Sequence, residues 1–358
     1  MNEKLLMTPG PTNVPKRVLD SMSQSMMHHR TSEFSSMLSQ LSERLKYVFQ
    51  TSSDVLTFPA AGTGGLEAVL VNLFSPGDRV LLVSIGVFGD RFAKIAQAFG
   101  LEVDKLEVKW GMGAAPQAIS DSLKDSHKAV IVTHNETSTA ATNDIQKIAE
   151  MLRGEDKLLI VDAVSSLGGI ELRMDEWGID AVVTASQKAL MSPPGLTFIS
   201  LSERAWEHIG KSKMPKYYWD FEKARADLNK AKPQNPYTPA VSLVAAADEA
   251  LAMIQEEGLE NVWKRHELVA KRVRSGVEKL GLKIYTHGDY LSNTVTAVDI
   301  GERAESVKAM LEKEHGIIIS GGQGHLKGRI IRIGHMGCID CEMADRTLRA
   351  LEDCMNRA

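Results

Sequence analysis

The chain has 358 residues, of which 43% are hydrophobic and 25% are charged, and at about 100–200 residues per domain this length predicts two domains. Lysine and arginine (42) nearly balance aspartate and glutamate (46), which gives a net charge of −4. The two signs are mixed along the chain, and this excludes the basic stripe of a nucleic-acid or anionic-membrane surface. No stretch reaches the roughly 18 apolar residues of a membrane helix, and the N-terminus has no signal-peptide core.

The three cysteines, Cys338, Cys341 and Cys354, all lie near the C-terminus. An odd, clustered set is not a disulfide framework, so we expect a reducing compartment and a cytoplasmic protein. The histidines lack metal-ligand spacing. His28 and His29 are adjacent, so their side chains are expected to point apart, and the cysteine pair at 338 and 341 has no second pair. We therefore expect no metal site.

Short apolar runs alternate with helical patterns between residues 55 and 201. Continuous apolar runs indicate strands covered on both faces, and their alternation with helices predicts a mostly parallel α/β sheet. The expected strands are Val55–Phe58, Val80–Ser84, Ala129–Thr133, Leu158–Asp162, Ala181–Ala185 and Leu196–Leu201, with helices over Phe88–Phe99 and over Asp144–Leu152, the second capped by Asn143.

The pattern changes after Leu201. Lys213–Pro239 is polar, rich in proline and without periodicity, and helical patterns follow over Val241–Ile254 and Leu259–Leu280. We expect an N-terminal segment over residues 1–14, a large domain over 15–257 and a smaller α+β domain over 258–358. The elements of this last domain are the strands Asn293–Asp299, Ile317–Ser320 and Ile330–Gly334 and the helices Glu305–Glu314 and Cys341–Met355.

Lys188 directly follows the strand Ala181–Ala185 and precedes a Pro-Pro-Gly turn. A lysine at a strand end is ordinarily a solvated charge, but small apolar neighbours would lower its pKa and make it a nucleophile toward carbonyls. Asp162 ends a buried strand, where it is either a turn residue or the partner of a cationic ring nitrogen. The two residues together, each at the C-terminal end of a sheet strand, are the arrangement that pyridoxal phosphate (PLP) needs.

Glycines at positions 62, 64 and 65 separate the strand Val55–Phe58 from an apolar helix. Glycines let backbone N–H groups approach a phosphate, the helix N-terminus favours an anion, and Thr63 adds a hydroxyl. A plain strand–helix turn is the alternative, and the pattern of a nucleotide triphosphate loop is absent. The later run Gly321–His325 is interpreted as a tight hairpin between two strands.

Arg332 lies inside the apolar strand Ile330–Gly334, where a charge is costly unless it is paired. Two interpretations remain open. The arginine either forms a structural ion pair or makes a two-pronged contact with a substrate carboxylate.

Together these residues resemble the class V aminotransferases of PLP fold type I, specifically the alanine/serine–glyoxylate (pyruvate) aminotransferase group. The resemblance runs almost from end to end of the chain and rests on several motifs in the same order. It implies an α/β fold with a large domain around a mostly parallel sheet and a smaller C-terminal α+β domain. The matching motifs are Thr8–Thr12, His28–Thr31, Ala61–Gly64, Thr133–Thr139, Asp162–Gly169, Ser186–Leu190 with Pro193–Gly195, and Arg332–Gly334.

The resemblance also implies a role for each matching residue. Lys188 would form the internal aldimine and then shuttle a proton between Cα of the substrate and C4′ of the cofactor. Asp162 would hold the pyridinium nitrogen, while the Gly10 backbone and Arg332 would hold the substrate carboxylate. The remaining implied contacts are Val164 and Phe88 on the two ring faces, Thr137 near O3′, and Thr63, Gly64, Gly65 and Gln187 around the phosphate. The family often has Trp or Tyr at the position of Phe88, so this chain keeps the stacking and loses a hydrogen-bonding group.

In this family the active site lies at a dimer interface, so the resemblance implies a homodimer with shared sites. Gln234, Tyr237 and Thr238 match the segment that reaches the phosphate of the partner subunit. Gly65 stands where some members carry His or Ala.

We expect an aminotransferase that moves an amino group from alanine or serine to glyoxylate or pyruvate. Arg332 can read only the α-carboxylate, and a dicarboxylate donor such as aspartate needs a second cation. The candidates, Arg30 and the Lys213–Lys216 stretch, do not lie in apolar runs that would direct them toward a ligand. Aspartate remains the alternative donor, because relatives with the Gly-Gly-Gln-Gly-x-Leu-Lys-Gly run of Gly321–Gly328 resemble aspartate enzymes.

Two other functions compete with this interpretation. A PLP lyase of the cysteine desulfurase kind needs a nucleophilic cysteine in the loop before the carboxylate-binding arginine, and Ser320–His325 contains none. A non-catalytic relative is possible in principle, since fold does not imply function. The presence of both Lys188 and Asp162 argues against it.

Overall fold

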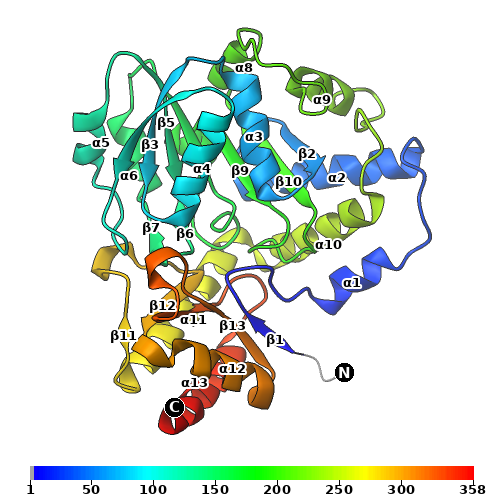
Figure 1. Cartoon of the computed structure of the whole chain (residues 1–358). Helices are drawn as coiled ribbons and strands as arrows, with labels where there is room; N and C mark the ends of the chain where they lie inside the picture. The colour runs from blue at the N-terminus through cyan, green and yellow to red at the C-terminus, as the bar shows by residue number, and fades with distance from the viewer. Residues whose placement is uncertain (1–3) are drawn as a thin grey trace.

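The structure, a computed structural model, describes residues 4–358 and is built around two large sheets (Figure 1). The larger sheet has seven strands in the order β2-β10-β9-β8-β5-β3-β4. Strand β10 is antiparallel to both of its neighbours and the other pairs are parallel, which confirms the predicted α/β class. The strands are β2 (Val55–Pro59), β3 (Arg79–Ser84), β4 (Glu102–Glu107), β5 (His127–Thr133), β8 (Leu158–Asp162), β9 (Ala181–Ala185) and β10 (Leu196–Leu201).

Helices cover both faces of the larger sheet, and this explains why its central strands are largely apolar. Val80 and Leu82 pack on one side, while Leu81 and Val83 pack on the other. The first face is covered by α3 (Gly62–Leu73), α4 (Val87–Ala98), α8 (Glu203–Ile209) and α9 (Phe221–Leu228), and the second by α2 (Ser32–Phe49), α5 (Pro116–Ser122), α6 (Ile145–Met151) and α10 (Val241–Glu257).

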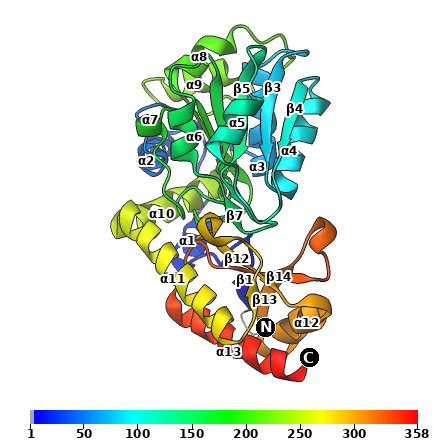
Figure 2. The same ribbon diagram turned by 90° about the vertical axis from the view of Figure 1, so that its left-hand side faces the viewer.

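The smaller sheet lies below the larger one in Figure 1 and has the order β1-β13-β14-β12-β11. The N-terminal segment supplies β1, which pairs in parallel with β13, so the two ends of the chain meet in one sheet. Figure 2 shows α11 and α13 running side by side along this unit. Its elements are β1 (Leu5–Met7), α11 (Leu259–Lys279), β11 (Lys283–Ile284), β12 (Val295–Asp299), α12 (Ala304–His315), β13 (Ile317–Gly321), β14 (Ile330–Gly334) and α13 (Cys341–Arg357).

The remaining elements are short: α1 (Lys16–Met22), β6 (Asn135–Glu136), β7 (Ala141–Thr142) and α7 (Met174–Trp177). Within residues 4–358, none of the helices combines the length and the apolar character that a membrane crossing requires. The predicted division into domains falls at Gly258, between α10 and α11, and remains a proposal; residues 1–3 of its N-terminal segment lie outside the described residues.

Two local predictions were wrong. The side chain of Asp144, not Asn143, caps α6 by accepting a hydrogen bond from the Lys147 N–H. Asn143 is engaged elsewhere, because its amide donates to the Thr133 carbonyl and accepts from the Ala114 N–H. The rings of His28 and His29 do not point apart but stack with centroids 4.9 Å apart. Adjacent side chains diverge in an extended strand, whereas these two lie in a turn before α2.

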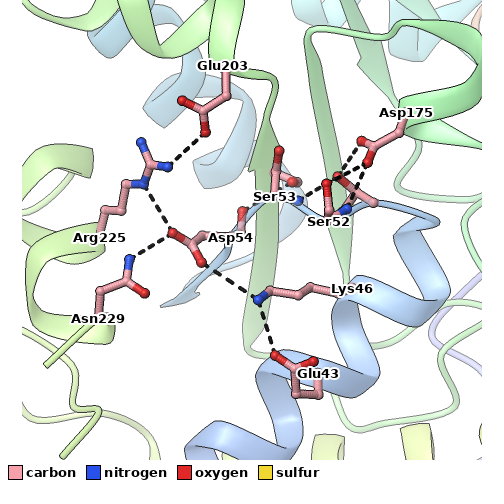
Figure 3. A network of polar contacts seen from close by, with 11 residues as sticks. Glu43, Lys46, Ser52, Ser53, Asp54, Asp175, Glu203, Arg225 and Asn229 are labelled. Atoms are coloured by element: carbon pink, nitrogen blue, oxygen red, sulfur yellow. Dashed lines mark hydrogen bonds and ion pairs between the residues drawn. The ribbon is translucent and has the colours of Figure 1, made fainter. Parts of the chain in front are cut away.

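A polar network holds α9 against the larger sheet at the start of β2 (Figure 3). This edge of the sheet is opposite to the edge at which the parallel strands have their carboxyl ends. Asp54 accepts hydrogen bonds from Arg225 Nε at 3.1 Å and from Asn229 Nδ2 at 2.8 Å. Lys46 Nζ lies 3.9 Å from the same carboxylate, and Glu203 pairs with the other side of Arg225. These contacts hold the helix that leads into the segment around Gln234.

Candidate active site

Lys188 and Asp162 lie at the same edge of the larger sheet, where its parallel strands end. Asp162 is the last residue of β8 and pairs in register with Thr133 of β5 and Val183 of β9. Lys188 follows β9 after a turn. Carboxyl ends of neighbouring parallel strands form the ligand-binding edge of such sheets. The structure therefore brings the two predicted residues to one place.

The segment after β1 crosses from the smaller sheet to this edge and contacts Lys188. Lys188 Nζ donates a hydrogen bond to the Pro9 carbonyl at 2.5 Å, and the Thr12 N–H donates to the Gln187 carbonyl at 3.2 Å. Gly10 has φ +113°, and a Cβ atom there would lie 2.5 Å from Lys188 Nζ. The predicted substrate-binding residue Gly10 thus borders the amine, and its position requires glycine both for its conformation and for the space.

Burial lowers the pKa of Lys188 to about 8, although the carboxylate of Asp162 opposes the shift. About one amine in ten is then neutral at pH 7, against roughly one in 3,000 at the ordinary pKa of a lysine. Only the neutral amine has the lone pair that attacks a carbonyl. Desolvation at the strand end therefore prepares Lys188 for the chemistry that its position suggested.

Asp162 is almost fully buried, and burial raises the pKa of its carboxyl to about 6. The Val164 N–H donates to Asp162 Oδ1 at 3.0 Å and favours the ionised form. Most of the carboxyl groups are therefore ionised at neutral pH. A cation placed against this carboxylate would gain a charge-assisted hydrogen bond in a site of low dielectric constant.

The start of α3 fits a phosphate group. The N–H groups of Gly62 and Thr63 precede the first intrahelical hydrogen bond, and no side chain among residues 4–358 caps this helix. These N–H groups can therefore donate to an anion. A Cβ atom on Gly62 would lie 2.6 Å from Val164 Cγ2, which brings this backbone next to the loop after Asp162. Gln187 Oε1 is also buried, with no hydrogen-bond partner in the described part of the chain.

Gly64 and Gly65 lie in the first turn of α3, and their contact with a phosphate remains a prediction. Their N–H groups both donate to the Ala61 carbonyl, at 2.9 and 3.4 Å. A Cβ atom on Gly65 would collide with Thr197 Oγ1 of β10, so this glycine lets α3 pack closely on the sheet. Close packing on the sheet therefore requires glycine at position 65.

Phe88 lies in the first turn of α4, which is held by a buried carboxylate that the sequence analysis missed. Glu136 Oε2 accepts the N–H groups of Phe88 at 2.9 Å and Gly89 at 3.1 Å. The guanidinium of Arg91 lies 4.7 Å from the centre of the Phe88 ring. A polar residue three positions after a buried strand was the available signal for Glu136, but many turn residues share it.

Arg332 reaches across from the smaller sheet to the edge of the larger one. Its Nη1 donates to the Thr137 carbonyl at 3.0 Å, and its Nε donates to the Gly321 carbonyl at 2.8 Å. Nη1 also lies 3.4 Å from Gln323 Oε1, so its hydrogen bonds within residues 4–358 all go to neutral oxygens. Burial lowers the pKa of the guanidinium to about 10. The carboxyl of Glu136 favours the charged form of Arg332 without hydrogen-bonding to it, and an anionic ligand would further lower the cost of burying this cation.

Comparison with known proteins decides the family. The family model "Aminotransferase class-V" matches residues 5–334. The chain belongs to the class V aminotransferase family. It is thus a PLP-dependent transaminase of the alanine/serine–glyoxylate group, and its substrates are amino acids and 2-oxo acids.

Relatives of this aminotransferase carry several names. A Synechococcus protein named soluble hydrogenase, small subunit, is 41% identical over 94% of this chain and 89% of its own length. A serine–glyoxylate aminotransferase of Methylorubrum extorquens is 37% identical over 93% of this chain and 86% of its own length. An L-aspartate–glyoxylate aminotransferase of Paracoccus denitrificans is 35% identical over 94% of this chain and 87% of its own length.

Solved structures lead to the same family. The crystal structure of a Bacillus subtilis ureidoglycine–glyoxylate aminotransferase superposes with a TM-score of 0.95 at 33% identity, covering 100% of this chain and 94% of the other. The names of these relatives differ in the amino donor, so similarity alone does not identify it.

In this aminotransferase the segment that contains Gln234, Tyr237 and Thr238 contacts Arg30 and Tyr217 of the same chain, and its contact with the phosphate of a partner subunit remains a prediction. Arg30 hydrogen-bonds to Gln234 and, at 3.0 Å, to the Asn235 carbonyl. Tyr237 donates to the Tyr217 carbonyl at 3.0 Å, and Thr238 is exposed. The guanidinium of Arg30 is therefore engaged within its own chain.

Proposed function

We propose that this aminotransferase holds pyridoxal phosphate at the edge of the larger sheet through Lys188 and Asp162. When bound, the cofactor supplies a sink for the electrons released at Cα of the substrate. The observation that carries the proposal is a buried amine with a pKa of about 8 next to a buried carboxylate at the ends of β9 and β8.

Each neighbouring residue then has a defined task. Asp162 keeps a ring nitrogen protonated, the neutral form of Lys188 accepts the proton from Cα, and Arg332 fixes the α-carboxylate. Val164 and Phe88 orient the ring from its two faces. The phosphate is proposed to lie at the N–H groups of Gly62 and Thr63, beside Gln187 and with Thr137 near the ring.

The donor that we propose is alanine or serine, with glyoxylate or pyruvate as acceptor. Arg332 binds one carboxylate, and Arg30, which could have bound a second, is held by Gln234 and Asn235. Aspartate remains the second candidate because Arg91 on α4 places another cation over Phe88, 4.7 Å from its ring centre. A dicarboxylate donor would use such a cation for its side chain.

Donor preference is testable in a single turnover. The absorbance band of the Lys-linked cofactor disappears when the donor reacts, and the slope of this rate against donor concentration is compared between donors. We expect the slope for alanine or serine to be at least about 10²-fold above the slope for aspartate. If aspartate leads by that margin, the proposed donor is wrong. In that case Arg91→Gln should remove the lead of aspartate and leave the slope for alanine unchanged.

We also infer a homodimer from an apolar surface beside the segment that contains Tyr237. Tyr217 and Met26 are 78% and 74% exposed, and Met26 lines a groove of about 720 Å³ together with Thr238 and Leu243. Exposed apolar area of this kind is typical of an interface between subunits. Sedimentation at assay concentration is expected to show a dimer, and an active monomer would contradict the inference.

A further inference from the structure

Residues 321–329, which are the last residue of β13 and the loop that leads to β14, contact the Arg332 guanidinium and are called the 321–329 loop. The loop closes through a hydrogen bond from the Gly322 N–H to the Ile330 carbonyl at 3.0 Å and contains a short 3-10 turn, Gly324–Leu326. It supplies two of the oxygens that Arg332 contacts, the Gly321 carbonyl at 2.8 Å and Gln323 Oε1 at 3.4 Å. A shift of this loop would therefore move the guanidinium.

Trp110, which follows β4 in the larger unit, packs directly against this loop. Its ring centroid lies 4.3 Å from that of His325. A Cβ atom on Gly324 would lie 2.9 Å from Trp110 Cη2, so the indole covers the backbone of the 3-10 turn. Trp110 also packs on a small apolar cluster that contains Leu326 of the same loop and Ala140 of the larger unit.

The chain next to Trp110 is itself fixed. The His287 N–H donates to the Gly111 carbonyl at 2.9 Å, and a Cβ atom on Gly113 would lie 2.5 Å from Tyr290 Cδ1. A cavity of about 320 Å³ adjoins the contact and is lined by both Trp110 and His325. Without the indole, the loop would have room to move toward this cavity.

We propose that Trp110 is a positioning residue for substrate binding, because its indole holds the 321–329 loop in the place where Gly321 and Gln323 aim Arg332. This inference rests on the proposed function of Arg332 as the carboxylate-binding residue. Trp110 itself does not contact Arg332 and acts only through the loop. A small displacement of a positioned group is enough to weaken a two-pronged contact strongly.

The test is Trp110→Ala in the cofactor-loaded enzyme, with propionate as a carboxylate probe. We expect the KM for the amino donor and the inhibition constant of propionate to rise about 10- to 100-fold, with kcat changed by less than about threefold. Calorimetric titration with propionate gives the dissociation constant without turnover and should show the same rise. Trp110→Phe should restore most of the affinity, since a smaller ring can still cover the loop. Trp177→Ala, which truncates another half-buried tryptophan on the remote helix α7, should leave both constants unchanged.

The two proposals can fail separately. If Arg332→Lys weakens propionate binding and Trp110→Ala does not, the role of Trp110 is wrong and that of Arg332 stands. If Arg332→Lys leaves propionate binding unchanged, the proposed function of Arg332 itself is wrong. Should Trp110→Ala fail to fold, His325→Ala removes the contact from the loop side. It is expected to weaken propionate binding in the same direction, and unchanged binding would overturn the inference.

Discussion

Replacing Lys188 with alanine is expected to abolish the covalent attachment of pyridoxal phosphate and to lower the rate of the half-reaction by about 10²–10⁴-fold or more. The variant loses the buried amine that the structure places at the ends of β8 and β9, with its pKa lowered to about 8 by burial. It should still fold, because Lys188 makes its contact with the Pro9 carbonyl and not with the cores of the two sheets. The measurement is the absorbance band of the Lys-linked cofactor and its loss on treatment with borohydride.

A matched control is Lys211→Ala, since this lysine is exposed. The control should keep both the absorbance band and the rate. Wild-type turnover in Lys188→Ala, with any amino acid as donor, would defeat the assignment.

Asp162→Asn is expected to lower the half-reaction rate by roughly tenfold to a few hundredfold, which corresponds to about 1.5–3 kcal/mol for one charge-assisted hydrogen bond. Asparagine nearly preserves the shape and can still accept the hydrogen bond from the Val164 N–H, so the change removes chiefly the charge. The rates are measured by stopped-flow absorbance in each half-reaction.

The pH dependence provides a second readout for Asp162. Burial raises the pKa of this carboxyl to about 6 in the protein without cofactor. The group is therefore neutral below about pH 6 and cannot pair with a cationic ring nitrogen there. Protonation of Lys188 lowers covalent attachment in both proteins below about pH 8, but a further fall in affinity through about pH 6 is expected only where Asp162 is present and should be absent in Asp162→Asn.

Asp180→Asn is the matched control, because Asp180 is also buried but pairs with Arg204 before β9 begins, away from the site. This control should lower thermal stability and leave the half-reaction rates unchanged. Unchanged rates in Asp162→Asn would remove Asp162 from the mechanism.

Burial on both faces explains why most of the larger sheet could be predicted. The six expected strands of that sheet are present within two residues of their predicted bounds, since each is a short, largely apolar run. Strand β4 was missed because it is an edge strand, on which charged residues such as Glu102 and Lys105 are exposed or half-buried. The helix α9 was missed inside a polar, proline-rich stretch, where the Asp220 cap is the main local signal.

The sequence by itself determined the α/β class, the family resemblance and the pair Lys188 and Asp162, because periodicity and residue type at a strand end are local properties. Only the tertiary structure decided how the other groups join them. The Pro9 carbonyl comes from a segment 179 residues away from Lys188, and Arg332 reaches the Thr137 carbonyl across a separation of 195 residues. The contact between Trp110 and His325 of the 321–329 loop also joins residues that are far apart in the sequence. Such contacts depend on how the two sheets pack together, and no local pattern along the chain encodes that arrangement.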